Sequence, residues 1–316
     1  MLPAPIRLFR PGDWVKNAFV LIPLAFSVAG GAARPDGPQL HAMFMATALA
    51  VAAFCLAGSG FYAINDALDA EEDRKHPVKR NRPVASGAVP VGAALSGGVA
   101  AIAAGLVLAW LARPEVAAVI GIYVVLQVAY NLKLKRVRFI DVATIASGFV
   151  LRSIAGALAI AVPVSIWLVV VVFTLTLFLG FVKRLADIRA VQLARERGDA
   201  TDWKPRAGYD SVEDLNWLLS VTGTVTIMAY LMYALSDHAA KLFGARAMGF
   251  AVLTPLVLVV IHRMYLRANL GLGDSPIATM LGDRSARIAA FLFTGGVLAS
   301  LYWPAVGQFL GRLFGA

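Results

Sequence analysis

Long apolar runs, repeated along the whole chain, are the feature that most limits the folds open to this sequence. They recur at residues 17–30, 41–63, 90–112, 115–132, 139–161, 164–182, 215–235, 247–262 and 288–310. Each is close to the length of helix that crosses about 30 Å of hydrocarbon. Because 59% of the 316 residues are apolar and only 15% are charged, little sequence remains for a soluble domain. The runs predict an all-α, polytopic membrane protein with nine transmembrane helices, in which residues 1–316 form a single membrane-embedded domain.

The basic residues are distributed unequally between the two sides that these spans define. If the N-terminus is cytoplasmic, most of the 29 Lys and Arg residues fall in cytoplasmic segments and few lie outside. This asymmetry predicts a multi-pass protein of the inner (plasma) membrane with its N-terminus in the cytoplasm and its C-terminus outside. The net charge of +10 then belongs to the cytoplasmic face, and a nucleic-acid partner is not expected.

Three aspartates follow the second apolar run at a helical spacing. Asp66, Asp69 and Asp73 are placed at i, i+3 and i+7, which sets them within an arc of about 60° on one helix face. Carboxylates stacked in this way repel one another and are costly beside hydrocarbon unless a cation neutralises them. Mg²⁺ suits such a site because it takes oxygen ligands and is often completed by substrate phosphates. We predict that these three aspartates are metal ligands and catalytic residues, with Asn65 beside them; the alternative is a solvated acidic helix end.

Basic residues follow the aspartates within a few positions. Lys79, Arg80 and Arg82 precede Pro83 in the stretch that ends at Gly87. Carboxylates for a metal followed by cations for phosphate are the combination that a diphosphate site requires. The same basic residues would also serve as anchors at the cytoplasmic membrane surface, which is the competing interpretation.

Several motifs carry a resemblance to a known family. The stretch N-D-A-L-D-A-E-E-D, from Asn65 to Asp73, resembles the N-D-x-x-D-x-x-x-D motif of the UbiA-type intramembrane prenyltransferase superfamily, whose members have nine transmembrane helices. The continuation H-P-V-K-R-N-R-P-V-A-S-G more narrowly resembles the decaprenyl-phosphate phosphoribosyltransferase branch. Further matching stretches are R-P-G-D-W-V-K-N at 10–17, Y-N-L-K-L-K at 130–135, A-S-G-F-V-L-R-S-I-A-G-A at 146–157, F-V-K-R-L-A-D at 181–187 and L-G-D-R at 281–284.

The resemblance implies a helical bundle with a cytoplasm-facing active site and a Mg²⁺-dependent pentosyltransferase activity. Enzymes of this branch move 5-phosphoribose from phosphoribosyl diphosphate to a polyprenyl (decaprenyl-like) phosphate and release diphosphate. The implied partners are therefore both substrates and the membrane, with homo-oligomer formation left open. One departure bears on the substrate: aromatic prenyltransferases of the superfamily carry a second D-x-x-x-D motif, whereas here Asp187 is followed four residues later by Val191. The pattern of Lys183 and Arg184 ahead of Asp187 resembles the phosphoribosyl branch and favours a phosphate-rich substrate.

A long cytoplasmic connection is expected over residues 183–214, which include Trp203 and Tyr209. This loop could cover the site and exclude water; the alternative is an uninvolved surface helix.

The residues expected to bind or support the substrate phosphates lie near several helix ends. They are Lys16, Asn65, Lys79, Arg80, Arg82, Lys135, Arg152, Lys183, Arg184 and Asp187. Arg152 stands apart because it falls inside an apolar run, where a charged side chain normally faces a polar partner. We expect that partner to be a carboxylate of the cluster or a bound phosphate; Asp141, earlier on the same helix, is the structural alternative.

Two other functions compete with phosphoribosyl transfer. The nearer one is prenyl transfer from a polyprenyl diphosphate to an aromatic or other small acceptor, against which the missing second D-x-x-x-D motif argues. The other is a cation-coupled transporter or lipid-binding membrane protein. Transporters place ionisable residues near the bilayer midplane, whereas nearly all of the charges here lie near one face, so this class is disfavoured.

Overall fold

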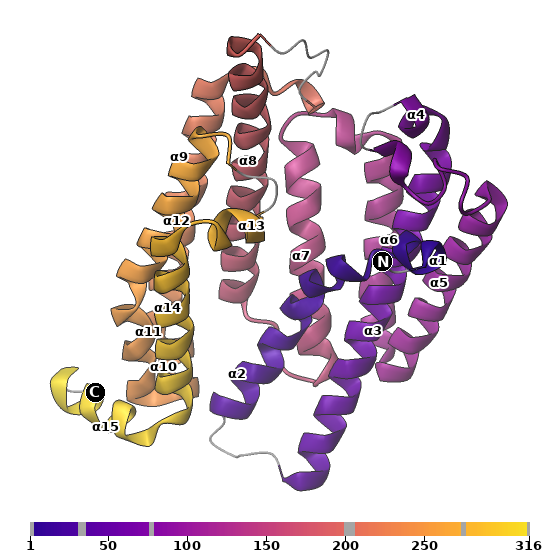
Figure 1. The fold of residues 1–316 in the computed structure, drawn as a ribbon. Helices are drawn as coiled ribbons and strands as arrows, with labels where there is room; N and C mark the ends of the chain where they lie inside the picture. Colours follow the sequence, from indigo (N-terminus) through magenta and orange to yellow (C-terminus); the bar gives the residue numbers. More distant parts are fainter. Residues whose placement is uncertain (1–2, 31–35, 76–78, 199–205, 273–275, 315–316) are drawn as a thin grey trace. The chain divides into compact units, whose positions relative to one another are not determined.

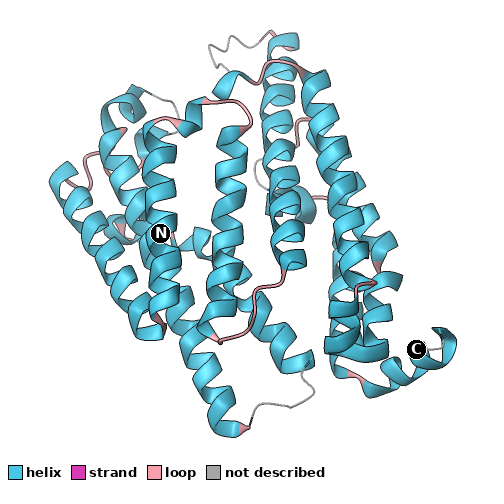
Figure 2. Cartoon of the chain, turned by 180° about the vertical axis from the view of Figure 1, so that it is seen from behind, coloured by secondary structure: helices cyan, strands magenta, loops and turns pink. Residues whose placement is uncertain are grey.

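The computed structural model describes residues 3–30, 36–75, 79–198, 206–272 and 276–314. Within these ranges the secondary structure is helical and contains no strand, as the apolar runs predict (Figures 1 and 2). The chain divides into two compact units. Unit 1 consists of Met1–Ala25, Pro35–Leu132 and Gly148–Val164, and unit 2 consists of Phe26–Arg34, Lys133–Ser147 and Ser165–Ala316.

Unit 1 is built around the long helix α3 and its neighbour α5. Its elements are α1 (Ala4–Leu8), the 3₁₀ helix η1 (Pro11–Leu21), the start of α2 (Ile22–Gly30), α3 (Gly37–Leu68), α4 (Ala70–Lys75), η2 (Lys79–Asn81), α5 (Val91–Ala112), α6 (Pro114–Leu132) and the later part of α7 (Ile140–Ala159). α3 begins where the Asp36 carboxylate accepts a hydrogen bond of 2.8 Å from the amide of Gln39, which satisfies one of the free donors of the first turn.

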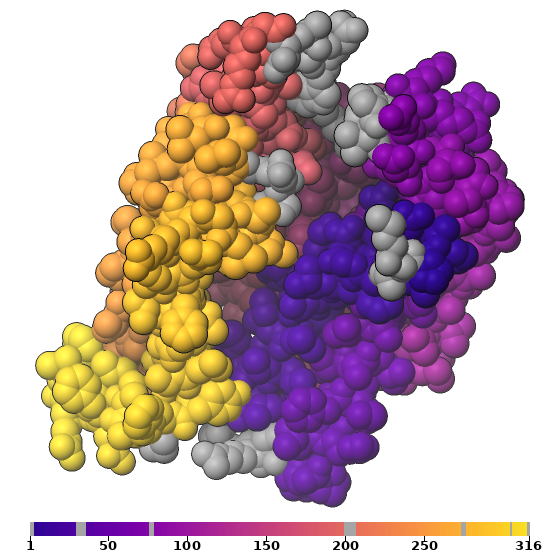
Figure 3. All heavy atoms as spheres, in the orientation of Figure 1, coloured from indigo at the N-terminus to yellow at the C-terminus, as the bar shows by residue number. Residues whose placement is uncertain are grey.

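Glycines allow α3 and α5 to approach closely. A Cβ placed on Gly60 would lie 2.5 Å from the carbonyl oxygen of Gly98, and a Cβ on Gly105 would lie 2.8 Å from that of Ala53. Small residues at such contacts bring helix backbones together, and van der Waals packing of this kind drives helix association in lipid. The space-filling view shows the indigo N-terminal segment against the purple atoms of unit 1 (Figure 3).

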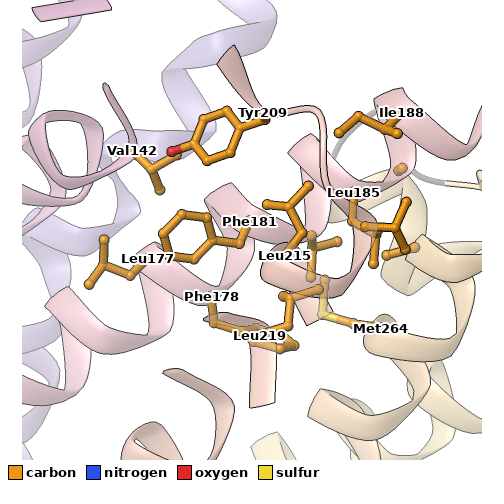
Figure 4. Packing of buried hydrophobic residues seen from close by; sticks show 14 of the residues in the cluster. Val142, Leu177, Phe178, Phe181, Leu185, Ile188, Tyr209, Leu215, Leu219 and Met264 are labelled. Atoms are coloured by element: carbon orange, nitrogen blue, oxygen red, sulfur yellow. The ribbon is translucent and has the colours of Figure 1, made fainter. Parts of the chain in front are cut away.

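Unit 2 has α8 and α9 at its centre. Its elements are η3 (Leu134–Arg136), the early part of α7, α8 (Ile166–Glu196), η4 (Arg206–Gly208), α9 (Val212–Ala234), α10 (Asp237–Phe243), η5 (Gly244–Arg246), α11 (Ala247–Val252), α12 (Thr254–Asn269), α13 (Pro276–Leu281), α14 (Arg284–Tyr302) and α15 (Pro304–Phe314). The core contains Phe181 and Leu185 of α8 together with Leu215 of α9, all fully buried (Figure 4).

The membrane-spanning helices agree with most of the apolar runs. Within the described residues, seven helices are long and apolar enough to cross a membrane, namely α3, α5, α6, α7, α8, α9 and α14. The helices Asp237–Val252 and Thr254–Asn269, bent by 47°, make an eighth if they form one span. The run at 17–30 is divided between η1 and the nine-residue α2. A count of nine spans and the orientation of the termini therefore stay predictions.

Two helices extend well beyond their apolar runs. α3 continues to Leu68 and α8 to Glu196, although the runs end near residues 63 and 182. Of the connection predicted over residues 183–214, the part up to Glu196 is therefore helical, so the loop prediction is wrong for that part. Helix-forming residues such as Leu185, Ala186 and Leu193 favour continuation of the helix, and the buried Leu185 and Ile188 pack it into the core of unit 2.

An ion pair joins α12 to the start of α14. The guanidinium of Arg263 donates to Asp283 through Nη2 at 2.6 Å and through Nε at 3.1 Å. Asp283 also caps α14, since its carboxylate accepts from the amide of Ala286 at 2.9 Å. The hydrogen bond from Arg263 and that from the Ala286 amide lower the pKa of Asp283 to about 2.

The close α3–α5 contact predicts that a larger residue at position 60 destabilises the protein. Gly60→Ala should lower the free energy of unfolding by about 1–3 kcal/mol, because the new Cβ would meet the α5 backbone. Thermal unfolding of the purified protein in detergent measures this change. Gly121→Ala in α6 is the matched control, since nothing lies within 4 Å of a Cβ there. Equal melting temperatures for Gly60→Ala and Gly121→Ala would contradict the packing.

The Asp283 pair predicts a dependence of stability on pH. The pKa of Asp283 is lower in the folded protein, at about 2, than in the unfolded chain, at about 3.9. Its contribution to stability is therefore complete above pH 4 and is lost as the pH falls through 2. The difference in melting temperature between wild type and Asp283→Asn should shrink over that interval. A difference independent of pH would rule out this contribution.

Candidate active site

The predicted aspartates lie at the end of α3 and on α4. Helix α3 ends at Leu68, Asp69 occupies the C-cap position, and Asp73 lies on α4. The hydrogen bonds of the helix continue across this junction: the amide of Asp69 donates to the carbonyl of Asn65 at 2.9 Å, and that of Asp73 donates to the carbonyl of Asp69 at 2.8 Å. The helical spacing of the motif is thus nearly preserved, with Asp66 and Asp73 both buried.

Two arginines neutralise the two buried carboxylates. Arg10 Nη2 lies 2.6 Å from Asp66 Oδ1. Arg82 Nη1 lies 2.7 Å from Asp73 Oδ2 and 3.3 Å from Asp66 Oδ1. Lys79 Nζ is 4.0 Å from Asp73 Oδ1. A carboxylate buried without such partners would be strongly unfavourable, so the acidic and basic parts of this segment stabilise each other.

The remaining predicted residues of this segment occupy more open positions. Asp69 is half-buried, and its Oδ2 accepts a hydrogen bond of 2.9 Å from Asn65 Nδ2. Arg80 lies on η2 and is exposed. Asp69 and Arg80 are therefore accessible to a ligand, whereas Asp66 and Asp73 are covered by the arginines.

The N-terminal segment brings further cations to α3. Arg10 stacks on the ring of Tyr62, with Cζ 4.7 Å from the ring centroid. Lys16 Nζ donates to the hydroxyl of Tyr62 at 3.3 Å and pairs with Asp13 at 2.5 Å. Tyr62 thus contacts two cations, one of which directly contacts Asp66 of the predicted site.

The carboxylate oxygens of Asp66 and Asp73 are of the chemical type that binds a divalent cation. Both carboxylates flank one cationic nitrogen, Arg82 Nη1, and Mg²⁺ is often held by one or two carboxylates and completed by substrate phosphates. Among the described residues, no group of three acidic, histidine or cysteine side chains is arranged to hold a metal ion. The assignment of Asp66, Asp69 and Asp73 as metal ligands therefore stays a prediction.

In unit 2, the predicted phosphate ligand Arg184 is engaged with a buried aspartate. Its Nη2 and Nε donate to Asp141 Oδ2 at 2.8 and 3.1 Å. Tyr209 donates through its hydroxyl to Asp141 Oδ1 at 2.8 Å and accepts from the amide of Phe139 at 2.7 Å. Burial and the hydrogen bond to Asp141 raise the pKa of Tyr209, so this hydroxyl stays protonated. Arg184 is thus held by Asp141, which is a structural partner and not a substrate phosphate.

The other predicted residues of unit 2 lie on η3 and α8. Lys135 belongs to η3 and is half-buried. Lys183 is exposed, its neighbour Arg184 is buried, and Asp187 is half-buried. Lys183 and Arg184 therefore occupy different environments on α8, and Lys183 is the more accessible to a ligand.

Arg152 is held by neutral groups of unit 1. Nε donates to Asn17 Oδ1 at 2.7 Å, Nη1 to the carbonyl of Gly148 at 2.8 Å, and Nη2 to the hydroxyl of Tyr123 at 3.3 Å. The guanidinium also lies 5.2 Å from the ring centroid of Phe54. Neither carboxylate partner expected from the sequence is bonded to Arg152 in the described contacts; carbonyl, hydroxyl and aromatic groups stabilise the cation instead.

The sequence analysis did not predict two residues that contact buried aspartates. Arg10 was part of the R-P-G-D-W-V-K-N stretch but was not predicted as a site residue, because 56 positions separate it from Asp66. Tyr209 was expected only as part of a loop that could cover the site, and the structure buries it against Asp141. Trp203 of the same expected cover lies outside the described residues.

The fold and this site define a multi-pass helical membrane protein with buried carboxylates and arginines at a helix end. The chain belongs to the UbiA prenyltransferase family, whose model matches residues 20–269.

Relatives and solved structures extend this comparison. The chain is 34% identical to the decaprenyl-phosphate phosphoribosyltransferase of Mycolicibacterium smegmatis, over 94% of this chain and 92% of the relative. It is 33% identical to the protein of the same name from Corynebacterium glutamicum, over 94% and 86%. The fold is similar to that of a UbiA homologue from Archaeoglobus fulgidus bound to DMAPP and Mg²⁺, with a TM-score of 0.63, 17% identity, and coverage of 95% of this chain and 99% of that one.

The buried Arg184–Asp141 pair in unit 2 predicts that a substitution at Asp141 strongly destabilises the protein. Asp141→Ala should lower the free energy of unfolding by about 3–5 kcal/mol, because it leaves Arg184 buried without a counter-ion. Asp214→Ala is the control, because the Arg138–Asp214 pair is exposed and such pairs contribute at most about 1 kcal/mol. Chemical denaturation of both variants provides the comparison. Equally small losses would argue against a structural role for the Asp141 pair.

Proposed function

We propose that this protein transfers 5-phosphoribose from phosphoribosyl diphosphate to a polyprenyl phosphate of the decaprenyl type and releases diphosphate. The observation that carries the proposal is the end-to-end similarity to two decaprenyl-phosphate phosphoribosyltransferases, each matched over 94% of this chain. The cluster of Asp66, Asp73, Arg10 and Arg82 supports it, because carboxylates beside guanidinium groups suit a metal-bound diphosphate.

Mg²⁺ is the cofactor that we propose. Asp66 and Asp73 would hold it, with Asp69 as a further oxygen donor nearby, and the bound ion would neutralise negative charge on the leaving diphosphate. The solved UbiA homologue with bound Mg²⁺ supports metal use within the family.

The protein's own residues contribute mainly charge and position. Arg82 and Lys79 place cations beside the carboxylates, and Arg80 lies exposed on η2 between them in sequence. Arginine in particular binds phosphate oxygens through two parallel hydrogen bonds. The bond between C1 of the ribose and the diphosphate oxygen breaks, and an oxygen of the lipid phosphate forms the new bond to C1 from the opposite side. The acceptor phosphate is already anionic near neutral pH, so the transfer requires no general base.

The other predicted residues have separate proposed roles. Lys16, Lys135, Lys183 and Asp187 remain candidates for contacts with substrate phosphates. Arg152 and Arg184 are proposed to stabilise their units through their bonds to Asn17 and Asp141. The proposed location is the inner membrane, with the reaction at its cytoplasmic face.

A radiochemical assay tests the function. Purified protein with labelled phosphoribosyl diphosphate, decaprenyl phosphate and Mg²⁺ should form a labelled lipid, identified by mass spectrometry. Asp66→Asn and Asp73→Asn should each lower the rate by at least about 100-fold, since each removes a carboxylate that would hold Mg²⁺ on the leaving diphosphate. Glu71→Gln, an exposed residue of α4, is the matched control and should retain activity.

The same preparation separates the proposal from prenyl transfer. A parallel reaction contains a polyprenyl diphosphate and an aromatic acid. Product in that reaction, together with the absence of labelled lipid from phosphoribosyl diphosphate, would refute phosphoribosyl transfer.

A further inference from the structure

Arg10 has an unusual backbone conformation. Its φ of 47° and ψ of 62° lie in the left-handed region, which costs a residue with a side chain on the order of 1 kcal/mol and persists only when neighbouring contacts enforce it. Ser59 of α3 provides such contacts on both sides of Arg10: its hydroxyl donates to the carbonyl of Phe9 at 2.7 Å and accepts from Trp14 Nε1 at 3.0 Å.

This conformation directs the guanidinium to Asp66. Arg10 Nη2 lies 2.6 Å from Asp66 Oδ1, and the ring of Tyr62 supports the guanidinium. The Asp66 side chain is only 2% exposed, whereas that of Arg10 is 28% exposed. Arg10 therefore covers a carboxylate that has little other access to solvent, while it remains partly accessible itself.

The cluster is electrically balanced without a metal ion. The charges of Asp66 and Asp73 are matched by those of Arg10 and Arg82, and both arginines contact the same oxygen, Asp66 Oδ1. A divalent cation that binds Asp66 must compete with these guanidinium groups. A diphosphate that arrives with the cation supplies new anionic oxygens, to which guanidinium groups bind well.

We propose that Arg10 exchanges partners when the donor binds. It leaves Asp66 as a divalent cation takes that carboxylate, and it then binds an oxygen of the donor's diphosphate. The exchange keeps charges paired before and after binding, and it makes the binding of cation and diphosphate mutually dependent. The inference rests on the proposed function only in that the donor carries a diphosphate.

Removal of Arg10 should change the two affinities in opposite directions. In full-length Arg10→Gln, Mn²⁺ alone should bind about tenfold more tightly than in wild type, because a competing cation is lost. Inorganic diphosphate at saturating Mg²⁺ should bind about tenfold more weakly, because a charge-assisted contact is lost; each change corresponds to about 1.4 kcal/mol. Electron paramagnetic resonance measures Mn²⁺ binding, and titration calorimetry measures diphosphate binding.

Two further variants serve as comparisons for Arg10→Gln. Arg7→Gln removes an exposed arginine from α1 of the same segment and should leave both affinities unchanged. Arg10→Lys keeps the charge without the planar fork, so diphosphate affinity should recover in part.

Several outcomes would overturn the exchange. They are weaker binding of both Mn²⁺ and diphosphate to Arg10→Gln, unchanged binding of diphosphate, or unchanged binding of Mn²⁺. A misfolded variant would lose both affinities and could not produce the expected opposite shifts. Opposite shifts in a protein that forms no phosphoribosyl lipid would support the role of Arg10 while rejecting the proposed function, because prenyl diphosphates carry the same group.

Discussion

The pairing of buried charges is the constraint on which the rest of this structure depends. An ionised side chain inside a membrane protein is expensive unless an opposite charge or several dipoles lie against it. Asp66 and Asp73 meet this requirement through Arg10 and Arg82, and Asp141 meets it through a separate arginine. The arginine pairs of Asp66 and Asp141 join segments that are distant in sequence, so the contacts that neutralise these charges also fix the chain around them.

The arginines differ in their partners and in their exposure to solvent. This difference distinguishes structural arginines from those at the reactive site. Arg184 and Asp141 are both almost inaccessible, and a tyrosine hydroxyl satisfies the remaining carboxylate oxygen. Arg152 relies on an amide, a carbonyl and aromatic rings. Arg10 and Arg82 are instead about one quarter exposed above buried carboxylates. Only such half-open pairs can change partners without unfolding the surrounding helices.

The sequence predicts the helical class, most spans and the acidic and basic segments, because these depend on local composition and periodicity. It does not predict the partner of each arginine, which depends on tertiary contacts. Arg184 pairs with Asp141 across 43 positions and Arg10 with Asp66 across 56. The end of α8 was also misplaced, because hydropathy marks where the apolar run ends, whereas Leu185 and Ile188 continue the buried face of the helix beyond it.

The length of α3 has a consequence for how a lipid substrate of the proposed kind reaches the site. Its 32 residues rise about 48 Å, more than the roughly 30 Å thickness of a hydrocarbon core. The carboxylates at its end can therefore lie at the depth of the head groups, where the phosphate of a polyprenyl lipid resides. Such a substrate needs only lateral diffusion within its own leaflet to arrive, and the water-soluble donor alone crosses the interface.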